Sequence, residues 1–224
     1  VVGDEAGTAL TTGDNNVAIG FEALSTEDAN GDNVAVGYRA LKALNAGADS
    51  FNTAVGYQAG QSLTTGLENA IFGSFAGDAL TDADFNTAIG GSTLSADTLG
   101  SKSTAIGFGA LAAQNFTTAT DSHNVAIGYH AGNDITTGTL NTLIGGLAGD
   151  ALTAADSNTA IGYVALSSDT RGERAIAIGE GALFSQNFTT ETNNYNVAIG
   201  YNAGYSVSTG TGQTLIGGLA GDAI

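Results

Sequence analysis

Acidic side chains are the first candidates for chemistry, because 22 of the 224 residues are Asp or Glu and only 5 are Lys or Arg. Asp78, Asp82 and Asp84 lie close together, and Asp150 and Asp156 repeat two of these positions 72 residues later. Calcium needs several oxygen ligands, which carboxylates on neighbouring repeats can supply. Asp is also a common residue of ordinary turns. The sequence therefore leaves calcium open as a cofactor and predicts no other.

Residue types used in catalysis are scarce in this chain. It has no Cys and only two His, His123 and His130, whose counterparts 72 residues later are Tyr195 and Asn202. No Ser lies in the Gly-x-Ser-x-Gly turn of serine hydrolases. The glycine-rich turns lack the Lys and the following helix of a phosphate-binding loop. The sequence predicts no catalytic residue, no cofactor-binding residue and no metal ligand set, and hence no enzyme.

The rest of the chain is organised around a short motif, of which Asn52–Gly60 is one copy. Its central glycine, position 0 of each repeat, recurs at 13 places: Gly3, Gly20, Gly37, Gly56, Gly73, Gly90, Gly107, Gly128, Gly145, Gly162, Gly179, Gly200 and Gly217. Most spacings are 17 residues, and from Gly56 on four repeats make a 72-residue super-repeat. A short fixed period predicts an array of stacked coils.

These repeats predict an all-β protein, namely a parallel β-roll or β-solenoid of about 13 coils. Each coil is expected to contain a strand before the glycine, a turn, a second short strand and a polar connection. Positions −1 and −3 carry mostly Val, Ile, Thr or Phe, and this alternation predicts that both point into the coil. We expect residues 1–224 to be one repetitive segment of a longer fibrous protein.

Position −2 is then expected to face outward. It is nearly always Ala, which has a low propensity for strands, so a close neighbour such as a second chain would explain it. The predicted subunit interface consists of Ala18, Ala35, Ala54, Ile71, Ala88, Ala105, Ala126, Leu143, Ala160, Ala177, Ala198 and Leu215. The alternative is a flat coil in which both faces of the strand pack inside one chain.

The motif resembles the head repeats of trimeric autotransporter adhesins, as in Asn16-Val17-Ala18-Ile19-Gly20. It is also similar to the Asn-Thr-Ala-Ile-Gly-Tyr-x-Ala-Gly repeats of phage-type tail fibres, which the aromatic residue at Tyr57 suits better. The resemblance covers essentially the whole chain. It implies a left-handed roll, a homotrimer and a role in adhesion or attachment.

Two four-residue insertions are the predicted ligand loops, because long loops on one side of a solenoid often carry binding residues. They lie between Leu111 and Asn124 and between Leu183 and Asn196. The candidate contacts for a glycan or a receptor are Phe116, Thr117, Phe188 and Thr189. The alternative is that each Phe folds back to cover the roll or wedges against a neighbouring chain.

The net charge of −17 argues against partners that are nucleic acids or anionic membranes. No apolar run is long enough for a membrane span. We therefore expect a structural segment of an extracellular, cell-surface or virion fibre, with other copies of itself as partners and a host-surface protein or glycan as a further one. The alternatives are a receptor- or glycan-binding module that uses the insertion loops, and a self-assembling filament subunit.

Overall fold

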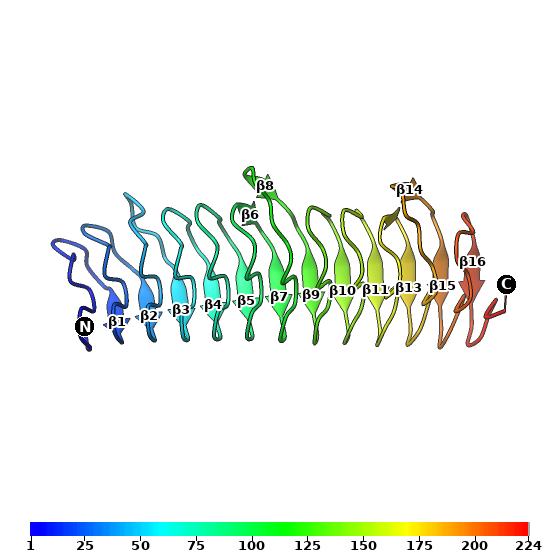
Figure 1. Ribbon diagram of the computed structural model, residues 1–224, viewed down its shortest axis with the longest axis horizontal. Coiled ribbons are helices and arrows are strands. Elements are labelled where there is room, and N and C mark those ends of the chain that lie inside the picture. The colour runs from blue at the N-terminus through cyan, green and yellow to red at the C-terminus, as the bar shows by residue number, and fades with distance from the viewer. Residues whose placement is uncertain (224) are drawn as a thin grey trace. The chain divides into compact units, whose positions relative to one another are not determined.

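A computed structural model describes residues 1–223, which form parallel β-strands joined by turns, with no helix among them (Figure 1). The predicted all-β solenoid with a 17-residue repeat is thus confirmed. The chain forms two compact units. Unit 1 comprises Val1–Phe108 and Asn115–Asp121, and unit 2 comprises Gly109–Gln114 and the described residues from 122 to 223.

Unit 1 contains six main strands, one from each successive coil. They are β1 (Val17–Ile19), β2 (Val34–Val36), β3 (Thr53–Val55), β4 (Ala70–Phe72), β5 (Thr87–Ile89) and β7 (Thr104–Ile106). They pair in parallel and in register, so that Ala18 lies opposite Ala35. An isolated parallel bridge between Val2 and Ile19 begins the stack. Two short strands, β6 (Gly100–Ser101) and β8 (Thr120–Asp121), pair at the inserted loop.

Unit 2 repeats this plan with six further main strands. They are β9 (Val125–Ile127), β10 (Thr142–Ile144), β11 (Thr159–Ile161), β13 (Ile176–Ile178), β15 (Val197–Ile199) and β16 (Thr214–Ile216). The short strands β12 (Gly172–Glu173) and β14 (Thr192–Asn193) pair at the second inserted loop. The short strands of unit 2 begin 72 residues after those of unit 1, at Gly172 and Thr192 against Gly100 and Thr120, as the 72-residue super-repeat predicts.

The segment after each glycine is a turn, so the prediction of a second strand there is wrong. Positions +2 and +4 have positive φ, for example 52° at Glu22 and 49° at Leu24, which interrupts an extended backbone. The coils still bond to one another in this segment, since the Leu24 amide donates to the Ala40 carbonyl at 3.0 Å. Glycine is required at position 0, because a Cβ on Gly37 would lie 2.2 Å from the Gly56 carbonyl oxygen.

The strand faces are reversed relative to the prediction, so the proposed interface column of Ala residues is wrong. Eleven of the twelve predicted interface residues are fully buried inside their own chain: Ala18, Ala35, Ala54, Ile71, Ala88, Ala105, Ala126, Leu143, Ala160, Ala177 and Ala198. The twelfth, Leu215 in the last coil, is half-buried. Positions −1 and −3 point outward instead. A shift of one residue exchanges the two faces of a strand, and the narrow interior of the coil admits the smaller side chain.

The larger residues of the inner column pack against glycines of their own coil and of the preceding coil. A Cβ on Gly60 would lie 3.0 Å from the side chains of Ile71 and Leu41, and a Cβ on Gly77 would lie 3.4 Å from Ile71. Leu143 occupies the same place beside Gly132 and Gly149 in unit 2. Ile71 and Leu143 therefore fill interior volume that Leu fills on other coils, which keeps the core close-packed. The prediction that a later apolar residue fills the same end of the core agrees with the burial of Leu63, Leu80, Ile135, Leu152 and Val207.

A ladder of buried Asn residues at position −4 joins successive coils. In unit 1 the Asn69 amide donates to Asn52 Oδ1 at 2.9 Å, and Asn52 Nδ2 donates to the Gly66 carbonyl at 2.7 Å. In unit 2 the Asn141 amide donates to Asn124 Oδ1 at 2.9 Å. Each net hydrogen bond of this kind contributes about 1 kcal/mol. The Asn that opens the motif is thus a structural residue, a role that the sequence analysis did not assign.

Candidate interaction surfaces

The outer face of the main sheet exposes a row of apolar side chains in each unit. Its residues are those at −1 and −3, and seven of them have exposed fractions between 36% and 41%: Val17, Ile19, Phe72, Ile89, Ile127, Ile176 and Ile199. Position −3 is Thr on six of the twelve main strands and Val, Ile or Ala on the others, so Thr supplies the polar atoms of this face. A strand face in water normally carries polar side chains, so an apolar face of this length is typical of an interaction surface.

The inserted loops are held down by buried residues. Phe116 and Phe188 are only 5% and 7% exposed, so the prediction that they stack on a ligand is wrong and the alternative, that they fold back onto the roll, is confirmed. Their rings pack where Gly100 and Gly172 leave room, since a Cβ on these glycines would lie 2.8 Å and 2.9 Å from the respective ring. Thr117 lies beside Phe116 on the surface.

A buried carboxylate anchors each of these loops. Asp97 Oδ1 accepts hydrogen bonds from the amides of Gly100 and Phe116, both at 3.1 Å. Asp169 does the same for Gly172 at 2.9 Å and Phe188 at 3.0 Å. The recurrence of Asp-x-x-Gly 72 residues apart, before each insertion, is the signal that sequence reasoning missed. Thr117 and Thr189 remain exposed, and their role as ligand contacts stays a prediction.

The Asp residues considered for calcium are used within the fold. Asp84 Oδ1 accepts from the Leu67 amide at 2.8 Å, Asp82 Oδ1 accepts from Thr65 Oγ1 at 2.7 Å, and Asp156 Oδ1 accepts from the Thr139 amide at 2.6 Å. Within residues 1–223, no three Asp, Glu or His side chains are grouped so that they could hold a metal ion.

Asp78 and Asp150 occupy equivalent, half-buried positions in the two units. In each, Oδ1 is buried without a hydrogen-bond partner. Burial raises the pKa of both carboxyl groups, and the nearby Asp134 carboxylate raises that of Asp150 further. Burial therefore disfavours the ionised form of both carboxyl groups.

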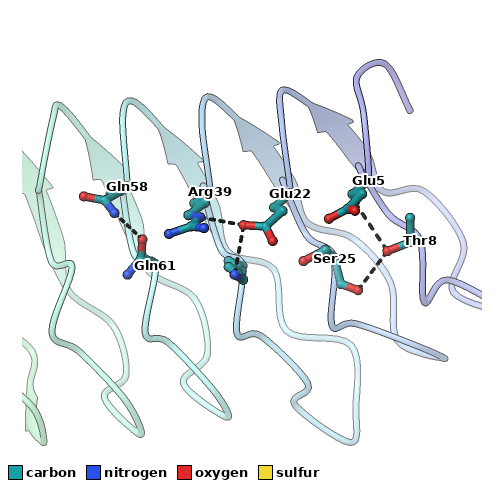
Figure 2. A network of polar contacts seen from close by, with 8 residues as sticks. Glu5, Thr8, Glu22, Ser25, Arg39, Gln58 and Gln61 are labelled. Atoms are coloured by element: carbon teal, nitrogen blue, oxygen red, sulfur yellow. Dashed lines mark hydrogen bonds and ion pairs between the residues drawn. The ribbon is translucent and has the colours of Figure 1, made fainter.

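A small ionic network lies on the turns of unit 1 (Figure 2). Glu22 Oε2 accepts from Lys42 Nζ at 2.9 Å and pairs with Arg39 Nε at 2.5 Å. The hydrogen bond from Lys42, with that from Arg39, lowers the pKa of Glu22. The Arg39 guanidinium also lies 5.0 Å from the centre of the Tyr38 ring. Glu22 and Arg39 belong to adjacent coils, so the network links successive turns.

Aromatic residues at position +1 form a row along the turns of each unit. In unit 1 the rings of Phe21 and Tyr38 stack at 5.5 Å, and those of Tyr38 and Tyr57 at 4.9 Å. In unit 2 the row instead has an aromatic ring on alternate coils, at Tyr129, Tyr163 and Tyr201. The two rows are thus built from the same position with different spacing.

The two histidines do not lie in a recognisable catalytic arrangement. His123 is exposed, whereas His130 packs against the Tyr129 ring at 4.2 Å. His130 Nδ1 lies 2.8 Å from Asn133 Oδ1. His130 therefore contacts an aromatic ring and an amide group, and it also lies near enough to the Asp150 carboxyl group to interact with it electrostatically.

Comparison with known proteins provides no family for the chain. No protein-family model, curated protein or solved structure matches it. Within the described part of the chain there is no pocket, and no helix that could cross a membrane. Any functional assignment must therefore come from the surfaces of the solenoid itself.

Proposed function

We propose that this chain is a structural segment of a fibre in which three copies associate through the outer faces of their main sheets. The observation that carries this proposal is the apolar outer face, to which every coil in each unit contributes. The contact residues are those at −1 and −3. They take the place of the Ala residues at −2, which the sequence predicted as the interface and which are buried. Ile89 in unit 1 and Ile127 in unit 2 are examples.

Burial of this face supplies the driving force for association. Complete burial of an Ile side chain is worth about 1.5–3 kcal/mol, so covering the exposed two-fifths of Ile89 would contribute about 1 kcal/mol. The same gain is repeated along the stack, because every coil presents two residues to the face. A repeated small gain favours a long side-by-side contact between chains over a single local one.

The number of three copies rests on the resemblance of the motif to adhesin heads and tail fibres. The same resemblance supports a location outside the cell or on a virion, and a role in adhesion or attachment. In this proposal the array holds an attachment surface away from the cell or particle. The net charge of −17 favours solubility of such an assembly.

The experiment is a measurement of molar mass by light scattering on the purified chain and on the double variant Ile127→Glu/Ile199→Glu. Both residues are exposed, so the substitutions should leave the coil intact while placing charges on the outer face. We expect the unaltered chain to be a trimer and the variant to be a monomer with an unchanged circular dichroism spectrum. The matched control is Thr137→Glu/Ser206→Glu, which adds the same charge at exposed positions away from this face.

A molar mass other than that of a trimer would contradict the proposed association of three chains. A monomeric unaltered chain would remove the outer face as a subunit contact, and a dimer would contradict the trimer. Polymers that grow with concentration would instead favour the self-assembling filament. If the control variant dissociates to the same extent, the added net charge causes the dissociation, and the outer face of the sheet does not.

A further inference from the structure

Unit 2 carries a row of three tyrosines whose side chains are largely in solvent. Tyr129, Tyr163 and Tyr201 are 59%, 57% and 56% exposed. They occupy the same position, +1, on alternate coils, directly after the glycine corner. The rings lie outside the buried core and the Asn ladder, and that of Tyr129 also packs against His130. A row of exposed aromatic rings on a regular framework is a surface that can bind a ligand through its flat faces.

The distance between the tyrosines is set by the backbone. The Leu147 amide donates to the Tyr129 carbonyl at 2.8 Å, and the Gly181 amide donates to the Tyr163 carbonyl at 3.0 Å. The Asn202 amide donates to the Glu180 carbonyl at 2.8 Å, which keeps the register across the inserted loop. Because neighbouring coils are spaced at about 4.8 Å, successive tyrosines are about 9.5 Å apart.

The coils between the tyrosines leave the row open. Gly146 separates Tyr129 from Tyr163, and the Tyr163 ring edge lies over it, with Cδ2 at 3.4 Å from where a Cβ on Gly146 would be. Glu180 separates Tyr163 from Tyr201 and is exposed. Tyrosine rings therefore alternate along the row with Gly146, which has no side chain, and Glu180, which can form hydrogen bonds. Its period is two coils.

We propose that Tyr129, Tyr163 and Tyr201 bind an extended, uncharged β-1,4-linked polysaccharide of the cellulose or chitin class. In such a chain successive sugars are turned over, so the same apolar pyranose face recurs once per disaccharide. That repeat is close to the spacing of two coils. Each tyrosine stacks on one sugar of every pair, and the Glu180 carboxylate accepts a hydrogen bond from a hydroxyl of the sugar between two platforms.

Charge selects against other polymers. Unit 2 lies in a chain with 22 acidic and 5 basic residues, and Glu180 is within the row, so anionic polysaccharides and nucleic acids are repelled. A helical α-linked glucan does not present a flat face at a fixed repeat. The row lies on the turns and is separate from the outer face of the sheet, so this inference does not depend on the trimer.

The test is retention of the purified chain on microcrystalline cellulose and on chitin, with granular starch as the α-linked comparison. We expect retention on at least one β-1,4 polymer and none on starch. Tyr163→Ala should weaken that retention about tenfold, because it removes the central platform. The matched control is Tyr195→Ala, since Tyr195 is 60% exposed in the same unit but lies outside the row.

Two further measurements make the result decisive. Molar mass is determined for each variant, so a loss of retention caused by a changed oligomer is recognised. Soluble cello-oligosaccharides of increasing length are then used as competitors, and competition should strengthen once a chain spans two tyrosines. No retention on either polymer, or an equal loss from Tyr163→Ala and Tyr195→Ala, would overturn the proposal. Retention on cellulose alone or on chitin alone would support it and identify which sugar is preferred.

Discussion

The aromatic rows of the two units differ although both occupy the turn that follows the glycine. In unit 1 the rings of Phe21, Tyr38 and Tyr57 lie on consecutive coils and stack on one another. In unit 2, Gly146 and Glu180 separate the tyrosines, and each ring remains more than half exposed. The same backbone thus supports a self-contained ladder in one unit and an open row in the other. The spacing of the aromatic residues along the coils therefore distinguishes the two rows.

Removing a ring should have its largest effect in the ladder of unit 1. Tyr38 stacks with a ring on either side and contacts Arg39, so Tyr38→Ala should lower the free energy of unfolding by about 2 kcal/mol. Tyr163→Ala should lower it by less than about 0.5 kcal/mol, as for an exposed position. Urea unfolding of both variants measures the difference. Equal losses would show that the two rows contribute alike to stability.

Filling the gap in unit 2 should convert its row into a ladder. Gly146→Tyr places a ring between Tyr129 and Tyr163, at a position where a Cβ makes only ordinary contacts. Stacking should raise the free energy of unfolding by about 1 kcal/mol and should also abolish the two-coil spacing on which polysaccharide retention depends. Gly146→Ala is the control for the loss of glycine. If the Gly146→Tyr variant is more stable and is still retained on the polymer, the importance of spacing is contradicted.

The ionic network of unit 1 should give a smaller, pH-dependent effect. The pKa of Glu22 is lowered by Lys42 and Arg39, so its contribution to stability is present above its unfolded pKa and is lost as pH falls through its lowered folded value. Glu22→Gln should therefore reduce the unfolding midpoint at neutral pH, and the difference should disappear in acid. Added salt should also shrink it, because these groups are at the surface.

The opposite sign is expected for Asp150 in unit 2. Burial raises its pKa, so the ionised carboxylate destabilises the fold at neutral pH, and this penalty is relieved as pH falls through the raised folded value. Asp150→Asn should raise the thermal midpoint slightly at neutral pH and have little effect in acid. Asp78→Asn is the equivalent test in unit 1. A lower midpoint for both variants would mean that the carboxylates have a stabilising partner.

The fold class, the 17-residue coil and the 72-residue super-repeat could all be predicted from the order of amino acids, because glycines and β-branched residues recur at fixed intervals. At position 0 only glycine fits, since the next coil lies too close for a side chain at Gly37. The role of Leu63 and its equivalents in the core was also predictable, because large apolar residues have few other places in a thin solenoid.

Which face of each strand lies inside depends on packing across the coil. Side chains of a three-residue strand point alternately to its two faces, whichever face lies inside. The prediction placed Val and Ile in the core because they are the more hydrophobic residues. The folded chain buries the small Ala126 completely and leaves the larger Ile127 36% exposed. The same holds for Phe116, whose burial depends on space above Gly100 and on an anchor, Asp97, from the preceding coil. Contacts between coils, which no local pattern encodes, determine both the outer face and the burial of the inserted loops.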